Sequence, residues 1–150
     1  GGALEYAGQP LRNNFDIVLA SVAMDGCALQ HAGKELRSNR RIVLTAVGQA
    51  GEALQYAQDE LKRDHEVVLT AVQQDGKALQ FAAAELKGDH DIALTAVRRD
   101  GRALQHVAEE LRRSRETVVA AVGQDGCALQ YASEPLKGDH DIVLTAVRRD

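Results

Sequence analysis

Three acid–histidine–acid clusters recur in this chain, an arrangement that serves hydrolase active sites and metal centres. They are Asp64-His65-Glu66, Asp89-His90-Asp91 and Asp139-His140-Asp141. A carboxylate beside an imidazole can support general acid–base catalysis, and both groups are common zinc ligands. Adjacent residues on a helix point about 100° apart, however, so the side chains of one cluster do not converge on a single substrate atom. The residue types suggest chemistry that their spacing disfavours.

The clusters belong to a repeat that covers the whole chain. The 150 residues divide without gap or insertion into six units of 25, namely 1–25, 26–50, 51–75, 76–100, 101–125 and 126–150. Every unit opens with glycine and has Leu at its fourth and eleventh places and Val at its twenty-second. The opening glycines are Gly1, Gly26, Gly51, Gly76, Gly101 and Gly126. A period of this length is typical of solenoids, in which each unit buries apolar surface against its neighbours.

Each unit is predicted to contain two short helices, of which the first runs from about the second to the ninth place. Leu4, Ala7 and Leu11 share one helical face in this segment. Pro10 and Pro135 stand late in it. Because proline removes a backbone donor and clashes with the preceding turn, we expect the helix to end near the eighth or ninth place. A separate turn then carries the following leucine, and Ser133-Glu134-Pro135 fits a small cap of that turn.

The second helix has clear start and stop signals. Its expected N-cap place holds Asn14, Asn39, Asp64, Asp89, Ser114 and Asp139, all of which can accept from free amides of a first turn. Acids follow two residues later, where the helix dipole favours them, and Arg41 is the exception. The next unit's glycine follows the apolar run, at a helix-terminating position where a positive φ costs least. The pattern predicts an all-α fold, an α-solenoid of six helix–turn–helix repeats.

Composition narrows the function classes. Aromatic residues make up 3% of the chain and the net charge is −4, which gives no general attraction to phosphate backbones or acidic membranes. No apolar run approaches the roughly 18 residues of a membrane span. We expect a soluble protein whose two cysteines, Cys27 and Cys127, are reduced thiols in a reducing, intracellular compartment. Nothing in the sequence indicates a cofactor or a small-molecule substrate.

The repeat pattern resembles a known helical-repeat family. The pattern G-x-A-L-x-[YFH]-A-x-x-x-L-[KR]-x-[DN]-x-[DE]-[IV]-V-L-x-A-V-x-x-D is similar to that of the family called domain of unknown function 4116, with two units here corresponding to about one such domain. The resemblance implies an all-helical array of a kind found in long tandem series, largely in unicellular eukaryotes. It implies no known activity. The chain departs from it by placing His65, His90 and His140 where the family often has Arg or Lys.

The histidine clusters have a structural interpretation. Asp89 is explained as a cap and Asp91 as a partner of the helix dipole, which leaves His90 as a tolerated surface substitution. Metal binding by His65 and His90 is the alternative, although equivalent atoms of adjacent units lie about 8–10 Å apart and zinc needs nitrogens at about 2.0–2.1 Å. His140, two units beyond His90, cannot join such a site.

Other polar residues have similar alternatives. His31 and His106 share the sixth place with Tyr and Phe, which indicates a half-buried position with a wet edge. Four units separate Cys27 from Cys127, which excludes an intrachain disulfide in an intact array and leaves a surface thiol or an intermolecular bond. The arginine pairs 98–99, 112–113 and 148–149 suggest a nucleic-acid-binding array, but acids are interspersed and stacking aromatics are missing.

The regular polar positions give the preferred hypothesis, a non-catalytic scaffold or protein-binding module. Its candidate binding residues are the glutamines of the fifth place, Gln30, Gln55, Gln80, Gln105 and Gln130. Thr45, Thr70, Thr95 and Thr145 recur in the second helix, and either set could support stacking or line a groove for an extended partner. The variable second, eighth, ninth and thirteenth places are better placed to set partner choice. Because neither end is a polar cap, we expect a longer array or neighbouring subunits.

Overall fold

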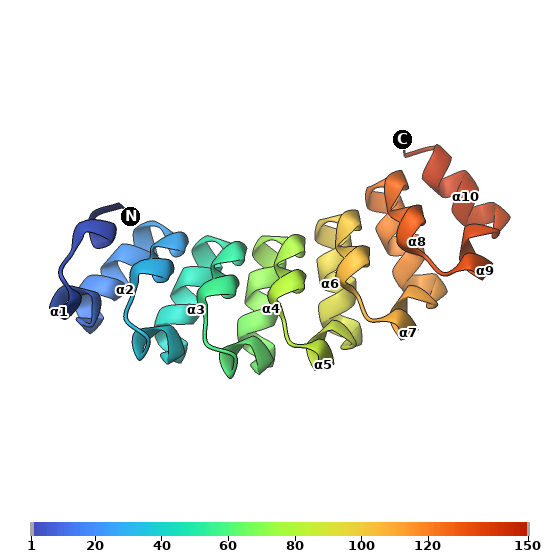
Figure 1. Ribbon diagram of the computed structural model, residues 1–150. Helices are drawn as coiled ribbons and strands as arrows, with labels where there is room; N and C mark the ends of the chain where they lie inside the picture. Colours follow the sequence, from blue (N-terminus) through green and yellow to red (C-terminus); the bar gives the residue numbers. More distant parts are fainter. Residues whose placement is uncertain (1, 150) are drawn as a thin grey trace.

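Six long α-helices, one from each unit, stand side by side in chain order in the computed structural model (Figure 1). The structure describes residues 2–149, and within this range it contains helices and turns but no strand. The helices are α2 (Phe15–Met24), α3 (Arg40–Gln49), α4 (His65–Gln74), α6 (His90–Arg99), α8 (Arg115–Gln124) and α10 (His140–Val147). The two ends of the chain lie at opposite ends of the row. The prediction of an all-α solenoid is confirmed.

The first helix of each unit is a 3₁₀-helix, shorter than predicted. These helices are η1 (Gly2–Tyr6), η2 (Gly26–His31), η4 (Gly51–Tyr56), η6 (Gly76–Phe81), η7 (Gly101–His106) and η8 (Gly126–Tyr131). Each stops at the sixth place rather than the eighth or ninth, because the next two residues are extended and the backbone leaves the helix there. In unit four, for example, the Ala83 N–H donates to the Lys62 carbonyl of the preceding unit at 2.9 Å. This contact recurs in the other described units from the second onward and links successive units.

A third, very short helix lies between the other two, as the prolines predicted. These turns are α1 (Gln9–Arg12), η3 (Leu36–Ser38), η5 (Leu61–Arg63), α5 (Ala84–Lys87), α7 (Glu109–Arg112) and α9 (Glu134–Lys137), and they carry the eleventh-place leucines. Pro10 and Pro135 fall in the first two helical positions, where a missing N–H costs least. Ser133 takes the N-cap position of α9, but its side chain accepts no hydrogen bond there.

Side-chain caps fix the start of every long helix, as predicted. Asn14, Asn39, Asp64, Asp89, Ser114 and Asp139 each accept a hydrogen bond from a backbone amide of the first turn. The Asp89 carboxylate accepts from the Ile92 N–H at 3.0 Å, whereas the Ser114 hydroxyl lies 3.5 Å from the Thr117 nitrogen. The cap of α8 is therefore the weakest of the six, since the other contacts lie between 3.0 and 3.2 Å.

The opening glycines serve a purpose different from the one predicted. Among residues 2–149 no glycine has a positive φ, so these glycines do not end the preceding helix in a left-handed conformation. A Cβ on Gly76 would instead lie 2.4 Å from the carbonyl oxygen of Ala96, in the C-terminal turn of α6, the long helix of the same unit. The same contact recurs at Gly26, Gly51 and Gly101, at 2.2–2.4 Å. Glycine is required because the two backbones touch. Gly1 lies outside the described residues.

The core is one continuous aliphatic layer between the long helices and the 3₁₀-helices. Its largest fully buried side chains are the fourth-place leucines of units one to five and isoleucines and valines of the long helices. Among residues 2–149, Thr117 is the one buried polar residue, and its hydroxyl has no hydrogen-bond partner. The large apolar side chains that remain exposed belong to the first and last units: Tyr6, Leu11, Ile17, Met24, Leu144 and Val147.

Candidate functional site

In four of the six units, the first residue of the long helix reaches a carboxylate of the following unit. The Arg40 guanidinium lies 2.9 Å from the Asp64 carboxylate and also contacts Glu66. This hydrogen bond is the main reason that the pKa of Asp64 lies below its usual range. Arg115 repeats the contact one helix before the last, 3.4 Å from Asp139. These positions form a row of ion pairs along one edge of the array.

The histidines of the predicted clusters occupy the same row. The His65 Nε2 lies 3.8 Å from the Asp89 carboxylate, and the His90 Nε2 lies 3.4 Å from that of Glu116. His90 was predicted to be a tolerated surface substitution. It lies on the surface, and it faces an acid of the next unit, as Arg40 and Arg115 do. His140, in the last unit, instead lies 3.4 Å from its neighbour Asp141.

The geometry of this row does not assemble a metal centre. His65 and His90 face different carboxylates on different units, at 3.8 and 3.4 Å. Within residues 2–149 no group of three or more His, Cys, Asp or Glu side chains is arranged to hold a metal ion. The Asp89 carboxylate is already occupied by the helix cap, so the acid–histidine–acid sequence marks a helix start.

A second set of hydrogen bonds, which the sequence did not predict, links the C-terminal ends of adjacent long helices. The side chain at the twenty-fourth place of one unit donates to a carbonyl at the end of the preceding helix. Gln74 donates to the Gln49 carbonyl at 3.3 Å, and Arg99 to that of Gln74 at 3.3 Å. Gln124 donates to the Arg98 carbonyl at 2.6 Å. The recurrence of Gln or Arg at this place was the only signal in the sequence.

The cysteines are not joined in a disulfide. The Cys27 thiol lies 3.2 Å from the Glu52 carboxylate. Partial burial, together with this acid, raises the pKa of Cys27 to about 11. A thiol with such a pKa is protonated at neutral pH and a poor nucleophile.

The sixth-place histidines are half-buried, as predicted. Burial lowers the pKa of His106 below its ordinary 6.5, and the nearby Lys87 adds to this effect. His106 is therefore held neutral in the folded array, which makes it a structural side chain with a polar edge.

The glutamine ladder lies on the 3₁₀-helices. Four of its members are exposed and Gln55 is half-buried. Gln55 and Gln130 donate to carbonyls of their own 3₁₀-helices, Glu52 and Cys127, at 3.1 and 3.0 Å. The role of this ladder in binding stays a prediction.

The threonine ladder bonds to its own helices. Thr45, Thr70 and Thr145 donate to the carbonyl four residues earlier, at 2.7–2.9 Å. Such bonds satisfy the hydroxyl locally, so these residues do not present free donors to a partner.

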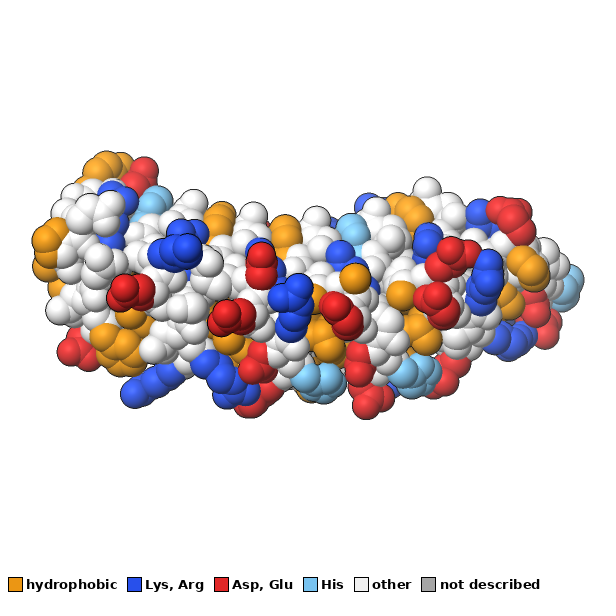
Figure 2. All heavy atoms as spheres, turned by 60° about the horizontal axis from the view of Figure 1, so that its bottom comes forward, with side chains coloured by type: hydrophobic (Ala, Val, Ile, Leu, Met, Phe, Trp, Pro, Cys, Tyr) orange, Lys and Arg blue, Asp and Glu red, His pale blue; other side chains and the backbone are white. Residues whose placement is uncertain are grey.

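Charges of both signs are mixed over the surface. Figure 2 shows Lys and Arg side chains interspersed with Asp and Glu on the face that it presents. Several charged side chains of the array are paired, as Arg102 is with Asp125 at 2.6 Å and Arg113 with Glu109 at 2.6 Å. This face therefore has no continuous basic stripe of the kind that follows a nucleic-acid backbone.

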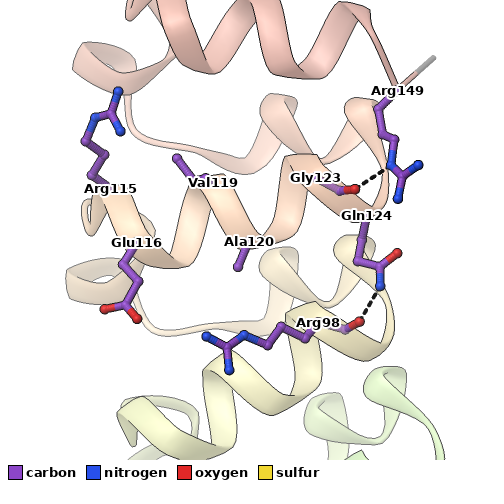
Figure 3. Close-up of a pocket in the computed structure, with 8 residues that line it drawn as sticks. All are labelled: Arg98, Arg115, Glu116, Val119, Ala120, Gly123, Gln124 and Arg149. Carbon is purple, nitrogen blue, oxygen red and sulfur yellow. Dashed lines mark hydrogen bonds between the residues drawn. The ribbon is translucent and has the colours of Figure 1, made fainter.

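An open groove with a volume of about 710 Å³ crosses the outer surface of α8 (Figure 3). Val119, Ala120 and Gly123 form its floor. Its rim consists of Arg98 from α6, Arg115, Glu116 and Gln124 from α8, and Arg149, which follows α10. The arginine pairs 98–99 and 148–149 stand out in the sequence, but no local pattern there predicts that Arg98 and Arg149 meet at one helix.

Comparison with known proteins gives a family and no activity. The family described as "Domain of unknown function (DUF4116)" matches residues 1–37, 14–62, 39–87, 64–112 and 114–150. Four of these matches start at N-caps of long helices, namely Asn14, Asn39, Asp64 and Ser114. No curated protein and no solved structure matches the chain. In residues 2–149 no helix is long and apolar enough to cross a membrane.

Proposed function

The chain belongs to the DUF4116 family, and we propose from its surface that it is a non-catalytic scaffold that binds other proteins. One observation carries the proposal. The array exposes side chains that differ from unit to unit, such as Gln73, Arg98 and Gly123 at the twenty-third place, on a framework whose backbone hydrogen bonds between units recur. Solenoids of this kind use their extended surfaces to bind partners, because the variable side chains cost the framework nothing.

The contacts of the acid–histidine–acid clusters and of Cys27 support a non-catalytic role. The carboxylates of Asp64, Asp89 and Asp139 serve as helix caps, and the histidines beside them face acids. The Cys27 thiol has a raised pKa of about 11, unlike an activated nucleophile.

Crosslinking of the full-length protein in its native extract tests the proposal. Proteins joined to this chain are identified by mass spectrometry, purified, and titrated against the isolated full-length protein by calorimetry. We expect at least one direct, saturable protein partner whose crosslinks map to outward-facing residues. The absence of any partner that rebinds in purified form would refute the proposal, as would a turnover assay in which the protein itself converts a substrate.

A further inference from the structure

We propose that the groove across α8 binds an acidic segment of a partner protein, with its carboxylates on Arg98 and Arg149 and an apolar side chain on the floor between them. This inference rests on the protein-binding function proposed above and deepens it by naming the site and the chemistry of the partner. Three separate observations support it: the groove, the free donors on its rim and its apolar floor.

The groove exists because α8 departs from the repeat at three outward-facing positions at once. Val119 stands where the other units have Leu, and Ala120 stands where four of them have Thr. Gly123 stands at a place that holds Arg or Gln in three other units. A Cβ on Gly123 would meet nothing within 4 Å, so packing does not require glycine there. Only unit five combines these three residues. Their small side chains leave a depression over α8, between α6 and α10, which carry larger side chains at these places.

Two guanidinium groups on the rim have donors to offer. The Arg98 side chain makes no hydrogen bond or ion pair with any described residue. Arg149 uses its Nε to contact the Gly123 carbonyl, which fixes the guanidinium at the groove and leaves its two terminal nitrogens available (Figure 3). Neither group is neutralised by a carboxylate in residues 2–149, although the chain as a whole carries a net charge of −4.

The remaining charges on the rim are already paired. Arg115 lies 3.4 Å from Asp139 and 3.8 Å from Asp141. Glu116 lies 3.4 Å from the His90 imidazole. These groups leave Arg98 and Arg149 as the two unpaired charges, and both are positive. The electrostatic complement is a ligand with two negative groups.

The floor decides which anionic ligand fits. Val119 and Ala120 are half-buried and apolar, and the groove has no aromatic side chain on which a nucleobase could stack. A peptide supplies what the groove lacks, namely planar carboxylates for bidentate pairing with guanidinium and a small apolar side chain for the floor. An acidic peptide segment therefore fits better than a nucleic acid.

Fluorescence anisotropy with a labelled synthetic peptide, Glu-Glu-Leu-Ala-Leu-Glu-Glu, tests the proposal on the full-length protein. The control probe replaces each Glu by Gln and keeps the apolar centre. We expect the Glu peptide to bind at least about tenfold more tightly than the Gln peptide, because a hydrogen bond to a charged group contributes about 1.5–3 kcal/mol and 1.4 kcal/mol is tenfold.

Two variants locate the binding. Arg98→Gln should weaken it by about tenfold, whereas Arg63→Gln, which removes an equal charge from an exposed site on η5, should leave it unchanged. The double variant Ala120→Thr/Gly123→Gln fills the floor with side chains that other units carry, and it should weaken binding by about tenfold without a change of net charge.

Three results would overturn the inference. They are equal affinities for the Glu and Gln peptides, equal losses from Arg98→Gln and Arg63→Gln, and tighter, salt-dependent binding of a single-stranded DNA of equal charge at the same groove. Failure of the peptide to bind while crosslinked protein partners rebind elsewhere on the array would reject this site and leave the proposed function standing. Loss of all protein partners would reject both.

Discussion

The buried hydroxyl of Thr117 predicts a substitution that stabilises the array. Its side chain is fully buried, with 0% exposure, and its oxygen has no hydrogen-bond partner. The equivalent positions hold Ile or Val in the other five units. Burying a hydroxyl without a partner costs about 1–3 kcal/mol in mutational data. Thr117→Val keeps the shape of the side chain and removes this cost, so the free energy of unfolding should rise by about 1–2 kcal/mol.

Urea denaturation followed by circular dichroism measures this change. The midpoint should move to higher urea at an unchanged slope, which indicates a gain in stability rather than a change in the unfolded state. Thr70→Val is the matched control, because the Thr70 hydroxyl donates to the Glu66 carbonyl at 2.8 Å on a half-exposed surface. It should shift stability by no more than about 0.5 kcal/mol. A Thr117→Val protein that is no more stable than the wild type would refute the reasoning that the hydroxyl is unsatisfied.

Three further predictions use the same denaturation assay. Gly76→Ala should lower the free energy of unfolding by about 2 kcal/mol or more, since its Cβ would lie 2.4 Å from a carbonyl oxygen. The control Gly123→Ala should be neutral or stabilising, because its Cβ would meet no atom within 4 Å. Similar losses in both variants would contradict the close contact at Gly76. Asp89→Ala should cost about 1 kcal/mol by removing a helix cap and Asp89→Asn much less, so an equal loss in both would argue against capping. The unfolded chain binds a proton at His106 more readily than the folded array, because folding lowers that pKa from 6.5. The free energy of unfolding should therefore fall as the pH drops below 6.5, and His106→Phe should reduce its dependence on pH. An unchanged pH dependence in His106→Phe would show that the imidazole is fully solvated in the folded array.

Local signals predicted the helix starts well. A side chain that accepts from the first turn depends only on residues two or three places away, as Asn39 does with Arg41 and Ile42 at 3.1 and 3.2 Å. The six caps could therefore be read from the sequence without knowledge of the tertiary structure. The separate turns that contain Pro10 and Pro135 were predicted from local signals as well.

Contacts between units could not be predicted from local sequence patterns. The row from Arg40 to Arg115 depends on how far one helix lies from the next, which no local pattern shows. The glycines were expected for their backbone freedom, yet Gly76 is required by the approach of Ala96, twenty residues later. The 3₁₀ form of the first helix was missed for a related reason: the segment after it leaves the helix to bond with the preceding unit, as Ala83 does with Lys62.

The repeat itself supplies the means to recognise specialised positions. The six units satisfy the same packing constraints, so a residue that differs from its equivalents without a packing reason has another cause. Helix α8 collects such departures. Its Ser114 cap is long at 3.5 Å, its Thr117 hydroxyl is buried and unsatisfied, and Ala120 and Gly123 lower its outer surface. The first two features weaken the helix and the last two open the groove, which is the pattern expected where a sequence has been shaped by binding as well as by stability.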